Sequence, residues 1–154
     1  MTDHRSGEGP SDDESRDDRR DTLAARHHRF GWWSLVVFVG VGLVLESLLG
    51  FRTPLLVDAD VETRRTMFRL AHAHGALLAL VNLALAASLR SGALAAEHSR
   101  RASRLVLAGS VALPAGFFLG GVWFHQADPG LGIVLVPVGA LALVAGLVTI
   151  ARRS

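Results

Sequence analysis

The sequence predicts an all-α protein, a four-helix transmembrane bundle of up-down-up-down topology preceded by a disordered N-terminal tail. Four apolar stretches of at least 20 residues follow one another along the chain of 154 residues. Each is long enough to cross the roughly 30 Å hydrocarbon core of a bilayer at about 1.5 Å per residue. Because the connections between them are short, consecutive helices are expected to be antiparallel neighbours. Residues 30–153 are the predicted membrane domain.

Residues 1–29 form the predicted tail, which we place in the cytoplasm. This segment is rich in Asp, Arg, Ser and Gly, and it contains only Met1 and Leu23 as large aliphatic residues. Such a composition buries too little apolar surface to fold alone. The long acidic region also differs from a secretory signal peptide. The tail ends in Arg26-His-His-Arg29, which is either a metal-binding pair of histidines or, as we favour, a solvated anchor on anionic headgroups.

The first predicted span covers residues 30–51. Trp32 and Trp33 mark one membrane interface, because tryptophan is enriched at that level. Glu46 is the only charged residue of this span and lies six positions before Arg52. A carboxylate at this depth needs a cationic, metal or hydrogen-bonding partner.

The second predicted span, residues 69–90, carries His72, His74 and Asn82. At about 100° per residue, Asn82 falls on a stripe of small residues, and the two histidines flank that stripe on opposite sides. Small residues let neighbouring helices approach closely. Ionisable groups within a span are candidates for function. The simpler interpretation is that both histidines bind headgroups, water or loop carbonyls at the interface.

The third and fourth predicted spans cover residues 105–124 and 129–151. The third contains Gly116-Phe-Phe-Leu-Gly120, a small-x-x-x-small pattern that favours close helix packing. Asp128 is a polar residue directly before the fourth span, and we expect it to cap that helix.

Composition excludes several classes of protein. The chain has no Cys, which excludes disulfides, thiolate metal sites and iron–sulfur clusters. All 16 basic residues are Arg, and the richness in Ala, Leu, Val and Gly is typical of a GC-rich bacterial gene. These arginines lie at the ends of segments, whereas nucleic-acid binding requires a clustered basic face. No nucleic-acid partner is therefore expected.

The distribution of arginine predicts the orientation. With four spans, the tail, the middle connection and the C-terminus share one side of the membrane, and near the spans they carry eleven arginines against four on the other side. The eleven are Arg16, Arg19, Arg20, Arg26, Arg29, Arg90, Arg100, Arg101, Arg104, Arg152 and Arg153, and the four are Arg52, Arg64, Arg65 and Arg69. The positive-inside rule then makes both termini cytoplasmic. We expect a multi-pass protein of the bacterial inner membrane, with the lipid bilayer and either further copies or a membrane complex as partners.

Three predicted spans each place an ionisable group near the outer end, namely Glu46, the pair His72 and His74, and His125. Glu46 is about 9 Å below Arg52, and His72 about 4.5 Å below Arg69, at 1.5 Å per residue. One outward-facing pocket holding all four groups is therefore predicted. Imidazole with carboxylate suits a transition metal. His72 with His125 suits axial ligation of haem, and the set also suits proton relay.

Three hypotheses for function remain open at this stage. The first is a ligand-binding membrane module built on His72, His74, His125 and Glu46. The second is a structural or interaction protein, in which Glu46 hydrogen-bonds a histidine and only fixes helix register. The third is a membrane enzyme that acts on a small lipophilic substrate, with a histidine as general base.

One resemblance supports the predicted fold. Arg69-Leu-Ala-His-Ala-His-Gly75, with Asn82 after it and Gly121-Val-Trp-Phe-His-Gln-Ala-Asp-Pro-Gly130 further on, resembles a group of small, uncharacterised bacterial membrane proteins with four spans. The resemblance covers roughly residues 64–151. It implies the four-span fold and a membrane location, and it implies no activity. The histidine-bearing span is more loosely similar to spans of haem-copper oxidase cores and small membrane mutases, but the further histidines of an oxidase core are missing.

Overall fold

The computed structural model describes residues 12–57, 61–94, 99–125 and 128–152, and this part of the chain confirms the all-α prediction. Four of its helices are long and apolar enough to cross a membrane, judged by length and composition. In chain order the elements are α1 (Asp12–Gly50), α2 (Pro54–Val57), α3 (Glu62–Arg90), α4 (Ser99–Val122), the 3₁₀ helix η3 (Leu131–Val134) and α5 (Leu135–Ala151).

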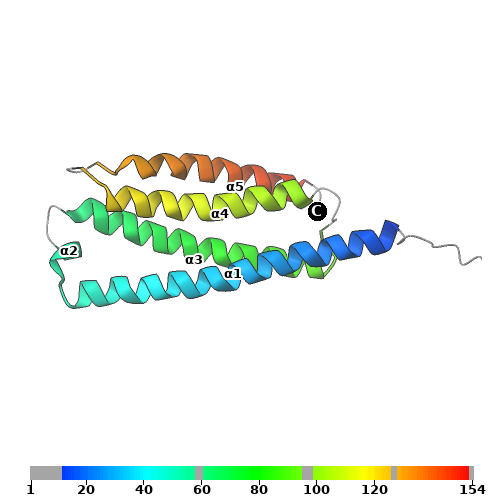
Figure 1. The fold of residues 1–154 in the computed structure, drawn as a ribbon, viewed down its shortest axis with the longest axis horizontal. Coiled ribbons are helices and arrows are strands. Elements are labelled where there is room, and N and C mark those ends of the chain that lie inside the picture. Colours follow the sequence, from blue (N-terminus) through cyan, green and yellow to red (C-terminus); the bar gives the residue numbers. More distant parts are fainter. Residues whose placement is uncertain (1–11, 58–60, 95–98, 126–127, 153–154) are drawn as a thin grey trace, which may run out of the picture.

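The four long helices pack in chain order, so that α1 lies against α3, α3 against α4, and α4 against α5 (Figure 1). The described chain starts and finishes at the same end of the molecule, as four antiparallel passes require (Figure 1). The short helix α2 lies at the opposite end, in the connection between α1 and α3. Helices α1 and α5 are therefore the outer members of the array.

The start of α1 differs from the prediction of a disordered tail through residue 29. The described chain is helical from Asp12 onward. The reason is tertiary, because Leu23 and Ala24 are buried in a cluster with Leu85 and Leu89 of α3 and with Val106 of α4. Burial of this kind offsets the ordering entropy that an isolated polar segment cannot offset. The first eleven residues of the predicted tail lie outside the described residues.

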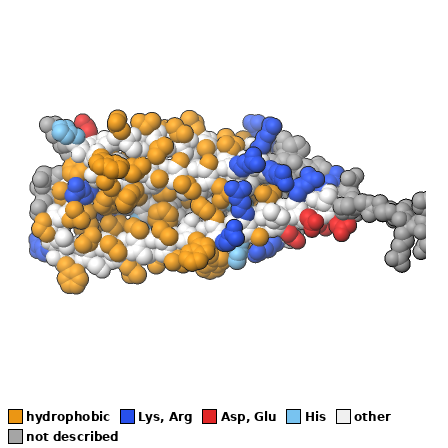
Figure 2. All heavy atoms as spheres, in the orientation of Figure 1, with side chains coloured by type: hydrophobic (Ala, Val, Ile, Leu, Met, Phe, Trp, Pro, Cys, Tyr) orange, Lys and Arg blue, Asp and Glu red, His pale blue; other side chains and the backbone are white. Residues whose placement is uncertain are grey.

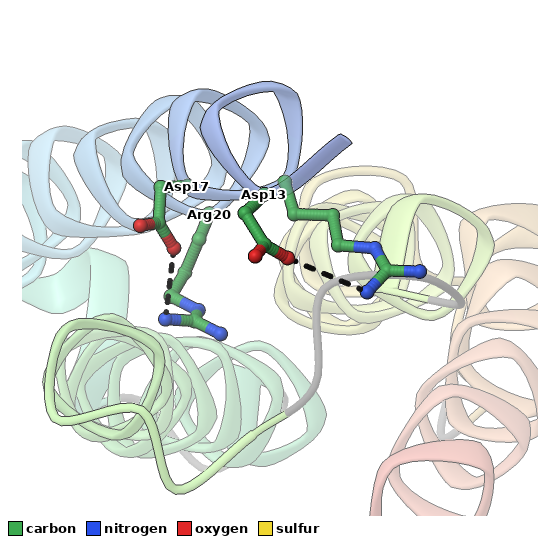
Figure 3. A network of polar contacts seen from close by, with 4 residues as sticks. Asp13, Asp17 and Arg20 are labelled. Atoms are coloured by element: carbon green, nitrogen blue, oxygen red, sulfur yellow. Dashed lines mark hydrogen bonds and ion pairs between the residues drawn. The ribbon is translucent and has the colours of Figure 1, made fainter. Parts of the chain in front are cut away.

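Local ion pairs accompany this packing at the start of α1. Figure 3 shows the pair Asp17–Arg20, whose closest nitrogen and oxygen atoms are 3.3 Å apart, and Asp13, which pairs with Arg16 at 3.8 Å. Both pairs have the i, i+3 spacing that brings side chains together on a helix surface. Because exposed pairs contribute little, we assign the ordering of this segment chiefly to the buried cluster.

Helices α1 and α3 interlock through rings that occupy positions opposite glycine. A Cβ added to Gly42 of α1 would lie 2.5 Å from the ring of His72 on α3. Reciprocally, a Cβ added to Gly75 of α3 would lie 2.3 Å from the ring of Phe38 on α1. The two helices therefore approach closely because each has a glycine opposite an aromatic ring of the other.

The contact between α4 and α5 also depends on glycine. A Cβ on Gly109 would lie 2.7 Å from the carbonyl oxygen of Gly139, and a Cβ on Gly116 would lie 2.9 Å from the backbone nitrogen of Val136. Gly120 is less constrained, since its nearest neighbour would be Pro129 at 3.6 Å. The Gly-x-x-x-Gly pattern thus lies on the face of α4 toward α5 and η3, with its tight contact at Gly116.

The connection from α4 to α5 corrects the predicted cap. His125 and Asp128 form an isolated antiparallel bridge through two backbone hydrogen bonds of 3.0 Å. The next helical turn has Gly130 at its N-cap, without a side-chain cap bond. Asp128 is therefore not the cap, because the bridge holds its backbone extended two residues before the turn begins.

The surface is divided along its length (Figure 2). An apolar region covers most of the visible face, a band of arginine follows it, and acidic side chains lie beyond that band. Val36 and Leu43 of α1 and Leu141 of α5 are among the exposed large apolar residues. We call the end of the molecule that carries Arg26, Arg29 and Arg104 the arginine end.

Candidate functional site

His72 lies at the contact between α1 and α3 and is half-buried. Its Nδ1 is 2.7 Å from the carbonyl oxygen of Phe38. A carbonyl only accepts hydrogen bonds, so Nδ1 carries the proton and donates, and Nε2 keeps its lone pair in the neutral ring. No hydrogen-bond partner for Nε2 occurs among the described residues.

His74 lies on the other side of α3. Its Nδ1 donates to the carbonyl oxygen of Leu70 at 2.9 Å, within the same helix. Its ring is 4.9 Å from that of Phe117 on α4, measured between centroids. His72 therefore contacts α1 and His74 contacts α4. Residues two apart on a helix point in nearly opposite directions, about 200° from each other.

The remaining candidates are exposed. Glu46 of α1 is solvent-accessible and lies four residues beyond Gly42, the residue that faces His72, which is about 6 Å along the helix. His125 and Asp128 are exposed at the connection after α4. Across the described ranges, no group of three or more His, Asp or Glu side chains is placed to hold a metal. The structure therefore does not bring the four candidates into one pocket, and their roles as ligands of a metal, haem or proton stay predictions.

The structure instead gathers polar side chains around Asn82 at the arginine end. Asn82 is fully buried, and its Nδ2 donates to the carbonyl oxygen of Leu78 at 2.7 Å and to the hydroxyl of Ser110 at 2.9 Å. Because the Leu78 oxygen can only accept, the atom facing it must be the amide nitrogen. The other amide atom is then the oxygen Oδ1, an acceptor.

His27 completes this arrangement, which we call the buried network and define as His27, Asn82, Ser103 and Ser110. The Nδ1 of His27 is 2.7 Å from Asn82 Oδ1, and its Nε2 is 2.7 Å from the hydroxyl of Ser103. Since Oδ1 accepts, Nδ1–H donates, and in the neutral ring the Ser103 hydroxyl donates to Nε2. The four side chains are between 0% and 4% exposed, so α1, α3 and α4 are cross-linked out of contact with solvent.

Sequence reasoning missed three members of the buried network, His27, Ser103 and Ser110, although it singled out Asn82. The missing signal was helical spacing continued into the supposed tail. Ala24, His27 and Gly31 are buried at steps of three and four residues, which is the spacing of one helix face.

The adjacent histidines His27 and His28 point in different directions. His27 is fully buried, whereas His28 accepts a hydrogen bond from the indole nitrogen of Trp32 at 3.1 Å near the surface. The alternative of a metal-binding histidine pair at this position therefore has no geometric support. Arg26 and Arg29 are exposed, so a solvated anchor at these two residues stays a prediction, and that interpretation is wrong for the buried His27.

No protein-family model, curated protein or solved structure matches this chain.

Proposed function

We propose that this protein is a multi-pass integral membrane protein with a structural or interaction role, in which the polar groups of the interior hold the helices in register. The observation that carries the proposal is the buried network. Asn82 uses both amide hydrogens and its oxygen within the protein, and both nitrogens of His27 have protein partners. A site that acted on a substrate would keep at least one such group available.

The proposed location is a bacterial inner membrane with both termini in the cytoplasm. Two features support it. The apolar region of the surface ends at a band of arginine (Figure 2). Near the spans, the side of the membrane that holds both termini carries eleven arginines, and the other side carries four. Reporter fusions at Ser154 and in the connection between α1 and α3 test it, and a periplasmic signal at Ser154 would overturn it.

Ligand binding at the histidines of α3 is the second candidate function. The observation that favours it is the orientation of both rings, since each donates Nδ1–H to a backbone carbonyl. Metal-ligating histidines have this arrangement, because the bond fixes the tautomer and leaves Nε2 to bind. His72 contacts α1 and His74 contacts α4. The Nε2 of each histidine would therefore act separately, as one ligand of haem iron or of a transition metal, or as the acceptor of one proton.

One purification separates the two candidates. The full chain is extracted from membranes in detergent, and its absorption spectrum is recorded before and after dithionite reduction, together with elemental analysis. The structural role predicts no haem band, no metal near one per chain, and spectra unchanged in His72→Ala and His74→Ala. Haem or metal at one per chain in the parent, lost in either variant, would overturn the structural role and establish ligand binding.

A further inference from the structure

A groove of about 570 Å³ opens between α1 and α4 at the arginine end. Three guanidinium groups line it, those of Arg26, Arg29 and Arg104, and apolar side chains that include Phe30, Trp33 and Leu107 line the rest. Its volume falls within the roughly 300–1,000 Å³ of small-molecule sites. It is separate from the buried network, because none of its lining residues belongs to that set.

On both helices an arginine comes first and apolar lining residues follow it. On α1, Arg26 precedes Phe30 and Trp33 by four and seven residues, so all three share one face. On α4, Arg104 precedes Leu107 and Val111 by three and seven residues. Both helices run away from the arginine end (Figure 1), so the charges lie at one end of the groove and the apolar side chains deeper.

The three arginines lack an acidic partner in the part of the chain that the structure describes. All three side chains belong to exposed residues, and none has an ion-pair partner among the residues that the structure describes. Arg20, further toward the start of α1, is paired with Asp17 instead (Figure 3). No carboxylate of the described residues neutralises these three guanidinium groups, so the groove can accept a bound anion.

We propose that this groove binds an anionic phospholipid, with the headgroup phosphate between the guanidinium groups and an acyl chain along Phe30, Trp33 and Leu107. Guanidinium groups bind phosphate oxygens through two parallel hydrogen bonds. Basic pockets between membrane helices on the cytoplasmic side bind acidic headgroups. A soluble phosphate would leave the apolar part of the groove unused, which favours the lipid. The inference rests on the membrane location proposed above.

The experiment uses the full chain with Trp32→Phe and Trp123→Phe, so that Trp33 in the groove is the only fluorophore. The chain is reconstituted in vesicles of phosphatidylcholine, and brominated phosphatidylglycerol or brominated phosphatidylcholine is added as the quencher of Trp33. We expect phosphatidylglycerol to associate about fivefold or more tightly than phosphatidylcholine, given the attraction between arginine and acidic lipid. In the variant Arg26→Gln/Arg29→Gln/Arg104→Gln, both brominated lipids should quench the fluorescence of Trp33 equally.

Arg152→Gln is the matched control, because it removes an exposed arginine at the end of α5, outside the groove, and should keep the preference. Equal quenching of the parent by both lipids would overturn the proposal. Loss of the preference on adding millimolar inorganic phosphate would also overturn it, since the site would then bind the free anion. Flotation of the vesicles tests membrane insertion separately. A chain that fails to float disproves the location, whereas a chain that floats without lipid preference disproves only the groove.

Discussion

Two histidine-containing regions of this protein differ in what their polar groups bind. At the arginine end, His27 is sealed among side chains from three helices and uses both ring nitrogens. Toward the opposite end, His72 and His74 are half-buried and donate one hydrogen bond each to a backbone carbonyl. The same residue type therefore acts as a structural link in one region, whereas in the other Nε2 has no hydrogen-bond partner among the described residues.

The difference teaches that burial of the partner, rather than the presence of histidine, decides what a substitution costs. The partners of His27 are buried side chains that lose their bond if the network is broken. The partners of His72 and His74 are carbonyls within helices, which keep a helical hydrogen bond of their own. Four substitutions of decreasing expected effect test this contrast.

Asn82→Leu should give the largest loss of stability. The substitution keeps the volume but leaves His27 Nδ1–H and the Ser110 hydroxyl without their partner, at about 1–3 kcal/mol for each buried group. Thermal unfolding of the detergent-solubilised chain measures the effect. Ser47→Ala serves as control, because Ser47 is exposed and, among the described residues, its hydroxyl bonds only the Leu43 carbonyl of its own helix. A melting temperature like that of the parent would show that the network contributes nothing to stability.

Gly42→Ala should have the next largest effect. The new Cβ would lie 2.5 Å from the His72 ring, which must move and give up its bond to Phe38. Overpacking of this kind costs about 1–3 kcal/mol, and a ring that can shift keeps the cost near the lower limit. In the background His72→Ala the same substitution should cost much less. Equal costs in the two backgrounds would mean that the ring does not occupy the space at Gly42.

The four helices and the predicted pocket differ in how far the sequence could predict them. Apolar length predicted the four long helices, and small residues predicted close packing, because both depend on composition along one chain. Depth from the nearest arginine predicted that Glu46 and His72 share one pocket, and this stays a prediction, because no hydrogen bond or ion pair between the two side chains occurs among the described residues. Depth along a span does not specify the direction in which a side chain points or the axial offset between neighbouring helices. In the structure, His72 faces Gly42, whereas Glu46 is exposed.

The buried network was hidden for a related reason. The Asp and Arg residues around His27 suggested a solvated tail. The composition of a short stretch reflects these charged residues on the outer face of a helix, and it does not reveal which residues of other helices pack against the inner face. The partners Ser103 and Asn82 are 76 and 55 residues away from His27 in the chain. Only the tertiary arrangement brings them within hydrogen-bond distance, so helical spacing could have placed His27 on a buried face but could not have identified its partners.

His74→Ala should destabilise the chain by about 1 kcal/mol, less than Asn82→Leu. The loss is the ring contact with Phe117, because pairs of aromatic rings contribute about 0.5–1.5 kcal/mol beyond their burial. His74→Phe should retain most of the stability, since it keeps a ring and removes only the bond to Leu70 within α3. Thermal unfolding in detergent compares the two. If the phenylalanine variant were the weaker, the hydrogen bond rather than the ring contact would hold this position.

Glu46→Gln should have the smallest effect, within about 0.5 kcal/mol, as is usual for exposed positions without a specific partner. Glu46 is exposed on α1, and no ion pair or hydrogen bond links its side chain to another described residue. It lies about 6 Å from Gly50, where α1 ends, so its carboxylate can extend to the polar boundary. Thermal unfolding of Glu46→Gln beside Asn82→Leu, in the same detergent, gives the comparison. A loss as large as that of Asn82→Leu would mean that Glu46 has a buried partner after all, and the single pocket with His72 and His74 would then regain support.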